Sequence, residues 1–223
     1  MQPCLFLLFG LLILGMVIAQ AHATGNNAAC TRALRQAFAA SPNAATLPAP
    51  CRHIGPVTLG LQKDEVLAAL GQPDATRGDA KHPDTLRVMY LYPRDLKARL
   101  AQHPLPLEMV GVTSLTVSFR NDQVINVDIF ASVSVPVPFN LLDQPVGTHV
   151  DRILQAIGGS PQGNSSRDYI QFSAMPLSLL VDPDTSAVVG LDIADNKDDL
   201  YNFGRFNLIL LKDPKSGLIN GVR

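Results

Sequence analysis

The cysteines are the residues whose chemistry and position in the chain make the firmest prediction. The chain contains three of them, Cys4, Cys30 and Cys51. Cys4 lies in an apolar N-terminal segment that we expect to be removed, so Cys30 and Cys51 remain as a pair. In an oxidising compartment they form a disulfide by default, and closing a loop of about 20 residues adds roughly 3 kcal/mol of stability. The alternative is a lipid-bearing Cys30, because two alanines precede it, but that would leave Cys51 without a partner.

The other residue types that could do chemistry do not form a recognisable site. Zinc needs three or four convergent ligands, whereas the histidines are scattered and none has a partner at ligand spacing: His53, His82, His103 and His149. The segment from Asp182 begins like a calcium loop, but its sixth position is Ala187 and its twelfth is Ile193, so we read a hairpin turn. No serine stands in a G-x-S-x-G motif. The sequence predicts no catalytic residue, no metal and no cofactor.

The charge balance argues against a nucleic-acid or anionic-membrane partner. Both reward a basic excess, and the chain has 18 basic and 19 acidic residues. One acidic run, Asp195–Asp199, could hold a cation or a basic partner, although we favour a solvated turn.

The first residues resemble a signal peptide. Leu5–Ala19 is apolar and uncharged, and small residues with the spacing that a signal peptidase reads follow at once. We expect cleavage after Ala23, with Ala21 as second choice. The alternative is an uncleaved anchor, but the run is shorter than the ~20 residues that a spanning helix needs. We therefore expect a periplasmic or secreted protein with no stable membrane anchor.

Two glycine-bounded segments repeat each other and predict two short helices. Gly60–Pro73 and Gly147–Gly158 align without a gap and share glycine, aspartate, leucine and alanine at matching places. Gly71 and Gly158 end these helices, and both should have positive φ because a left-handed residue closes a helix most cheaply when it is glycine.

A second pair of segments predicts two β-hairpins. Leu115–Ile129 and Leu179–Ile193 align without a gap, and each consists of two predicted strands joined by a polar turn. In the first, apolar and polar residues alternate along both strands. A further strand is expected before each hairpin, at Leu86–Tyr92 and at Asp168–Ser173. Thr31–Ala40 is rich in helix formers and predicts an N-terminal helix.

The predicted fold is α+β. Two tandem repeats of a short helical segment pack on three- to four-stranded antiparallel sheets, after a disulfide-stapled N-terminal helix. Unit one carries an insertion, Pro93–Val112, with a short helix at Arg94–Gln102, and the tail Phe203–Leu211 could add an edge strand. The expected divisions are a signal peptide 1–23, an N-terminal helix and linker 24–52, unit one 53–132, a linker 133–138 and unit two with the tail 139–223.

Gly60–Pro73, the aromatic strand Leu86–Tyr92 and the hairpin Leu115–Ile129 together resemble the SmpA/OmlA domain. That is the fold of the outer-membrane assembly lipoprotein BamE, and it is similar to one repeat of the β-lactamase inhibitor protein. The resemblance covers roughly residues 53 to 195 and implies protein binding without catalysis. The chain departs from the single-domain lipoproteins by its duplication and its lack of a convincing lipid-attachment cysteine. It departs from the tandem inhibitors by its stapled N-terminal helix and its lack of tryptophan.

The resemblance implies that the open sheet face bears the contacts with a partner. In unit one that face would carry six residues: Arg87, Met89, Thr116, Ser118, Asn126 and Asp128. An ordinary solvated sheet face is the alternative. We expect an exported, non-enzymatic protein-binding module in envelope assembly or scaffolding. The alternatives are an inhibitor or immunity protein against a secreted hydrolase, and an enzyme with a site between the two units.

Overall fold

The computed structural model describes most of the chain between residues 28 and 200. The predicted signal peptide, part of the predicted helix Arg94–Gln102 and the tail Phe203–Leu211 lie outside the described residues. The residues that the structure describes are 28–40, 46–78, 83–96, 98, 102, 105–106, 112–133, 135, 137–159, 162–163, 168–173, 175–200 and 218–219.

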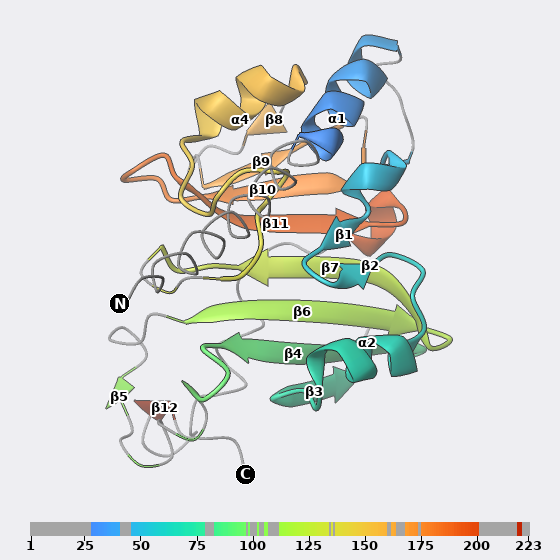
Figure 1. Ribbon diagram of the computed structural model, residues 1–223, viewed down its shortest axis with the longest axis vertical. Coiled ribbons are helices and arrows are strands. Elements are labelled where there is room, and N and C mark those ends of the chain that lie inside the picture. The colour runs from blue at the N-terminus through green and yellow to red at the C-terminus, as the bar shows by residue number, and fades with distance from the viewer. Residues whose placement is uncertain are drawn as a thin grey trace, which may run out of the picture.

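The fold is α+β, as predicted, and a single large antiparallel sheet dominates it (Figure 1). Eight strands follow one another in this sheet: β3 (Ala75–Gly78), β4 (Thr85–Tyr92), β6 (Thr113–Arg120), β7 (Gln123–Phe130), β11 (Val188–Ala194), β10 (Leu177–Val181), β9 (Tyr169–Gln171) and β8 (Gln162–Gly163). Two small sheets pair β1 (His53–Ile54) with β2 (Val57–Thr58), and β5 (Leu105–Pro106) with β12 (Leu218–Ile219).

The described residues include three α-helices: α1 (Ala29–Ala40), α2 (Lys63–Leu70) and α4 (Val150–Ile157). Short 3-10 turns occur at η1 (Ala49–Cys51) and η3 (Lys197–Asp199). None of these helices combines the length and the apolar character that a membrane crossing requires.

Both predicted hairpins are present. In the first, β6 and β7 are joined by Asn121 and Asp122, whose φ angles are 51° and 59°. Two consecutive left-handed residues form the turn whose twist matches that of the flanking strands, and asparagine and aspartate tolerate this conformation. In the second hairpin the Asp182 carboxylate accepts hydrogen bonds from the amides of Asp184 and Thr185, at 2.9 and 3.2 Å. The segment that begins like a calcium loop is therefore a hairpin turn, as expected.

The two repeated helices also form where the glycines predict them. Gly71 and Gly158 follow the last residues of α2 and α4, with φ of 76° and 71°. The expected positive φ is therefore confirmed at both positions. At the other end of α2 the Gln62 amide donates to the Glu65 carboxylate at 2.8 Å, so a first-turn acid supports the start of the helix.

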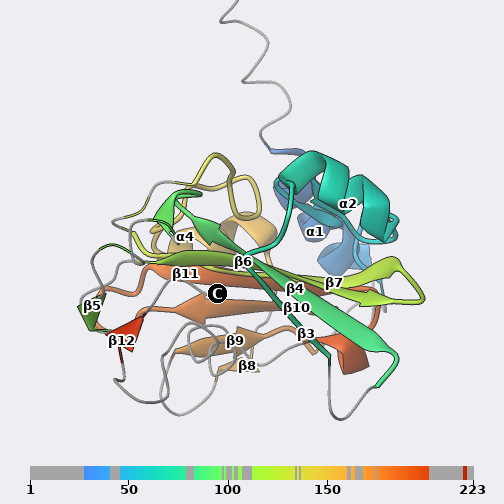
Figure 2. The same cartoon turned by 90° about the horizontal axis from the view of Figure 1, so that it is seen from below.

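All three helices pack on the same face of the large sheet (Figure 2). Each contributes a fully buried aliphatic side chain to one continuous core: Leu34 from α1, Val66 from α2 and Ile153 from α4. The strands meet them with the apolar half of their alternating pattern, as Leu115 and Val127 show with no exposed surface.

A disulfide ties the N-terminal helix to the rest of the protein. Cys30, in the first turn of α1, is bonded to Cys51 of η1, and their Cα atoms are 4.7 Å apart. The predicted pairing is confirmed. From the middle of α1, Arg35 donates to the carbonyl oxygens of Ala156 and Gln155 at 2.8 and 2.9 Å. A cation at carbonyls that lack helical partners stabilises the C-terminus of α4.

The continuity of the sheet is the main difference from the prediction. We expected two separate sheets of three to four strands, but β7 pairs with β11, with Asp128 opposite Asp192 and Val127 opposite Ile193. Alternation within a strand predicts its two faces, whereas its edge can pair with any strand of compatible length. The described residues of the expected linker, 133–138, form neither helix nor strand.

Candidate functional site

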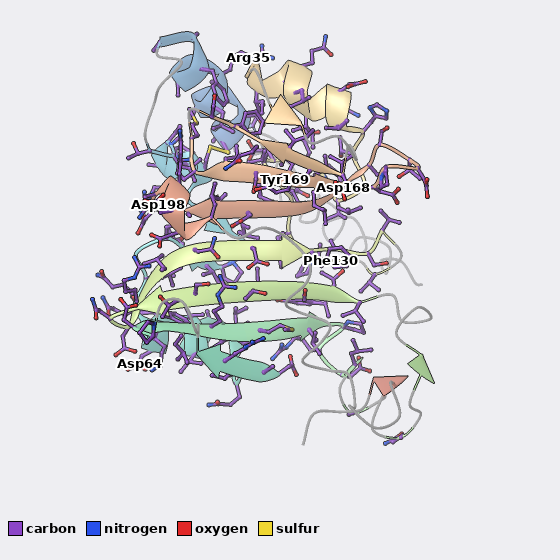
Figure 3. All side chains as sticks on the ribbon, turned by 180° about the vertical axis from the view of Figure 1, so that it is seen from behind. Arg35, Asp64, Phe130, Asp168, Tyr169 and Asp198 are labelled. Atoms are coloured by element: carbon purple, nitrogen blue, oxygen red, sulfur yellow. A yellow bond between two sulfur atoms is a disulfide. The ribbon has the colours of Figure 1, made fainter. Side chains whose placement is uncertain are left out.

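The six residues of the predicted binding face do share one face of the sheet, the face that points away from the helices. Cross-strand pairing aligns them in two rows: Arg87, Ser118 and Asn126 in one, Met89, Thr116 and Asp128 in the other. Figure 3 looks at this polar sheet face, where Tyr169 on β9 and Phe130 on β7 are labelled.

The polar sheet face is not open to solvent, contrary to our expectation. The exposed fractions are 2% for Arg87, 1% for Met89 and Ser118, none for Thr116 and Asn126, and 6% for Asp128. The alternating pattern identifies side chains that share a face but carries no information on whether the rest of the chain covers that face. A surface of this kind cannot receive a partner as it stands, so the interface role of these six residues stays a prediction.

The polar sheet face continues into the second half of the sheet, which sequence reasoning missed. Asp192 on β11 pairs directly with Asp128, and Ser178 on β10 pairs with Asp192; neither Asp192 nor Ser178 has exposed surface. The aligned hairpin segments held the signal for Asp192, because Asp128 and Asp192 occupy matching positions in that sequence alignment.

Hydrogen bonds connect three strands through Asn126. Its side-chain nitrogen donates to the Asp192 carboxylate at 2.5 Å and to the Ile193 carbonyl oxygen at 3.1 Å. The Ser118 hydroxyl donates to the Asn126 side-chain oxygen at 3.3 Å. Buried polar groups are expensive to leave without partners, so this arrangement fixes the Asn126 orientation and joins β6, β7 and β11.

Burial on this face changes the pKa of a tyrosine, Tyr169. Burial raises the pKa of Tyr169 above its usual value, the nearby Ser178 side chain lowers that pKa, and the negative charge of Asp192 raises it. Paired carboxylates can serve as acid and base, but Asp128 and Asp192 are too deeply buried to meet a substrate.

The surface has an open groove beside the disulfide, with a volume of about 660 Å³. We call it the strap groove; α1, its disulfide and the segment 138–143 border it. It is lined by Ala29, Cys30, Pro50, Cys51, His53, Gly55, Pro56, Pro138, Phe139, Asn140, Leu142 and Asp143. The sequence held no local signal for this groove, because its walls come from three segments that only folding brings together.

The walls of the strap groove are rigid. Three prolines and a disulfide restrict the backbone around it, and Phe139 packs edge-on against Tyr92 with ring centroids 5.9 Å apart. Gly55 allows the close approach of Phe139, since a Cβ atom there would lie 2.9 Å from the ring. A preformed groove loses less conformational entropy when it binds a ligand.

One wall holds a carboxylate in a fixed position. The turn 141–144 has positive φ at Leu142 and Asp143, 49° and 65°, which is uncommon for residues other than glycine. The Asp143 carboxylate accepts a hydrogen bond from the Thr31 amide at 2.8 Å, while the Thr31 hydroxyl donates to the Leu142 carbonyl oxygen at 2.9 Å. These bonds link the strained turn to the start of α1.

Arginines pair with both ends of the acidic run Asp195–Asp199, while Lys197 and Asp198 between them are exposed, as in the solvated turn that we favoured. Arg52 pairs with Asp195 at 2.5 Å, and Arg120 pairs with Asp199 at 2.7 Å. Asp199 is only 8% exposed.

A shallow pocket of about 460 Å³ lies beside the pair of Arg120 and Asp199, lined by Asp84, Arg120, Asn196, Asp198 and Asp199. Across the part of the chain that the structure describes, no three His, Cys, Asp or Glu side chains converge on a possible metal position.

Comparison with known proteins corrects the family assignment. No protein-family model matches the chain, so the resemblance to the SmpA/OmlA domain is wrong. The glycine-bounded helix and the hairpin that carried it are features of local folding, which unrelated proteins share. The roles that the resemblance implied, in outer-membrane assembly or hydrolase inhibition, lose that support.

No curated protein matches the chain. Among solved structures, a cysteine-rich secretory protein from Staphylococcus aureus subsp. aureus Mu50 is similar, with 10% sequence identity and a TM-score of 0.41. The match covers 69% of this chain and 56% of that protein, so the chain spans little more than half of its length. A likeness of this strength carries no argument about function.

Proposed function

We propose that the chain is an exported, non-enzymatic binding protein that recognises another protein through the strap groove. The single observation that carries this proposal is a preformed groove of about 660 Å³, framed by a disulfide and three prolines, whose walls combine apolar and polar groups in similar amounts. The proposal replaces the polar sheet face, which is buried, with a surface that a partner can reach.

The proposed place of action is the periplasm or the exterior of the cell. The disulfide is consistent with either location, since such bonds persist in oxidising compartments. The apolar leader, with cleavage after Ala23 or Ala21, supports the same proposal from the sequence.

We further propose that the body of the protein is a tandem duplication. Helices α2 and α4 have eight residues each and end at positive-φ glycines. In the large sheet, the order β3-β4-β6-β7 runs from one edge to the centre, and β8-β9-β10-β11 runs from the other edge to the centre. Two copies joined by their last strands would give this arrangement.

Site-specific crosslinking tests the binding function. A photoreactive phenylalanine derivative at Asn140, an exposed residue of the strap groove, should form a covalent adduct with a partner in envelope extract of the source organism. The same group at Ala68, exposed on α2 outside the groove, is the matched control. Adducts that form equally at both positions, or at neither, would contradict the proposal.

A further inference from the structure

The strap groove has a negatively charged side chain in its wall, which indicates what kind of group on a partner it would attract. Asp143 is a carboxylate, and the described residues of the lining include no lysine or arginine. Among the described residues, the Asp143 carboxylate accepts its hydrogen bond from a backbone amide, that of Thr31. The lining therefore offers a negative group without a cationic neighbour in its walls.

About half of the exposed lining is apolar, and this part suits an aliphatic chain. Phe139, Leu142 and three prolines supply apolar surface, and the exposed residues Asn140 and His53 add hydrogen-bonding groups at the margin. Lysine and arginine side chains combine an apolar stem with a cationic head, so they match both parts of such a surface.

The N-terminus of α1, next to Asp143, weakens the attraction between the Asp143 carboxylate and a cation without cancelling it. The N-terminus of a helix carries the equivalent of about half a positive charge, and the carboxylate carries a full negative one. The sum remains negative, so a cation is still favoured, with the modest strength of a partly exposed pair.

We infer that the strap groove binds a lysine or arginine side chain on an exposed segment of the partner protein, with the cationic head at Asp143. This inference rests on the proposed binding function and specifies the chemistry of its partner. The apolar stem lies along Phe139 and the prolines, and the surrounding partner residues remain outside the groove.

A peptide pair provides the test. Acetyl-Gly-Ala-Lys-Ala-Gly-amide and the same peptide with norleucine in place of lysine differ only in the cationic head. Titration into the full mature chain, followed by NMR shifts of backbone amides, should give a dissociation constant about three- to tenfold lower for the lysine peptide. The shifting amides should be those of Gly55, Phe139, Asn140 and Asp143.

Asp143→Asn identifies the group responsible. The amide keeps an oxygen that can accept from Thr31, so the start of α1 stays supported while the charge is lost. In this variant the preference for lysine over norleucine should disappear. A preference that persists unchanged, shifts that fall outside the groove, or equal affinities in the unsubstituted protein would each overturn the inference.

Asn140→Lys provides a second test that leaves Asp143 intact. A lysine at this exposed position adds a competing cation and should reduce lysine-peptide binding at least threefold. Gln155→Lys, exposed on α4 outside the groove, adds the same charge and should leave binding unchanged. Equal weakening by both variants would reduce the effect to net charge and overturn the inference.

The outcomes separate the two proposals. If a partner crosslinks at residue 140 equally well in the Asp143→Asn variant, the binding function stands and the basic-side-chain inference fails. If no partner crosslinks but the lysine preference depends on Asp143, the proposed protein-binding function fails while the groove chemistry stands.

Discussion

At the residue scale, two positions show how the surroundings of a residue decide which substitutions it tolerates. Gly71 has φ 76° and ψ −162°, a region that only glycine occupies at low cost. Tyr90 has no exposed surface, and its hydroxyl has no hydrogen-bond partner within the part of the chain that the structure describes. These two positions give opposite expectations for substitution, one strongly unfavourable and one tolerated.

Gly71→Val should lower the free energy of unfolding by about 2–3 kcal/mol, because a β-branched residue is strained at this φ and ψ. Gly78→Val is the matched control: it also has open space around its Cα, but it lies in strand β3 without a positive φ. Urea denaturation monitored by circular dichroism measures both. Equal effects would show that conformation at Gly71 is not the cause.

Tyr90→Phe should leave stability at pH 7 nearly unchanged and should reduce the loss of stability at alkaline pH. Burial raises the pKa of Tyr90 to about 12, while the Arg94 charge acts to lower it. The folded state therefore holds this proton more tightly than the unfolded state, whose pKa is about 10. Its contribution is complete below pH 10 and is lost as the pH rises towards 12.

Unfolding free energies at pH 7, 10 and 11.5 would check this expectation. Tyr92→Phe is the comparison. Burial also raises the pKa of Tyr92, and phenylalanine keeps the ring that packs against Phe139. An alkaline loss of the same size in Tyr90→Phe and in the unsubstituted protein would contradict the assignment.

At the element scale, helix α1 belongs to the second half of the chain in space although it comes first in sequence. Leu34 is fully buried in the shared core, the Phe38 ring is 5.5 Å from that of Phe172, and Arg35 binds the end of α4. The disulfide holds the other end of the same helix. These contacts hold α1 in place, and its first residues, Ala29 and Cys30, form part of the strap groove.

Replacement of both cysteines by serine should lower stability by roughly 3 kcal/mol, the entropy cost of a loop with a sequence separation of 21. The loss should appear first in α1, so hydrogen exchange at Leu34 should accelerate more than exchange at Val117 in β6. Arg35→Ala, which removes only exposed hydrogen bonds, should cost under about 1 kcal/mol. Uniform acceleration throughout the sheet would contradict this local role.

Local elements were predictable from the sequence because short-range chemistry determines them. Glycine boundaries predicted α2 and α4, alternation predicted both hairpins, and the cysteine count predicted the disulfide. The pairing of β7 with β11, the burial of Asn126 and the strap groove depend on contacts between distant segments, which no local pattern encodes. The family assignment failed for the same reason, since it extended local similarity to the whole fold.

At the scale of the whole molecule, one hydrophobic core and the large sheet extend through both halves of the protein. One half contains β3, β4, β6 and β7, and the other contains β8 to β11. Core residues from both halves are in contact, and Arg52 and Arg120 reach across to Asp195 and Asp199. Such continuity leaves neither half with an independent core, so unfolding should be cooperative.

Thermal and urea unfolding should therefore show a single transition with coincident probes. The amides of Val88 in β4 and Leu179 in β10 should exchange with the same free energy, because only global unfolding exposes either strand. Val127→Ala, at the buried β7–β11 junction, should destabilise both strands equally, by about 1–3 kcal/mol. Two separate transitions would show that the halves are independent domains.

The pairing of β7 with β11 also bears on solubility. Both strands are long, and each would present a row of free amide and carbonyl groups if its half stood alone. Joined to each other, they leave the four-residue β3 and the two-residue β8 as the outer strands of the large sheet. Short edges are poor templates for strand addition by another chain, so this order protects the protein against edge-to-edge aggregation.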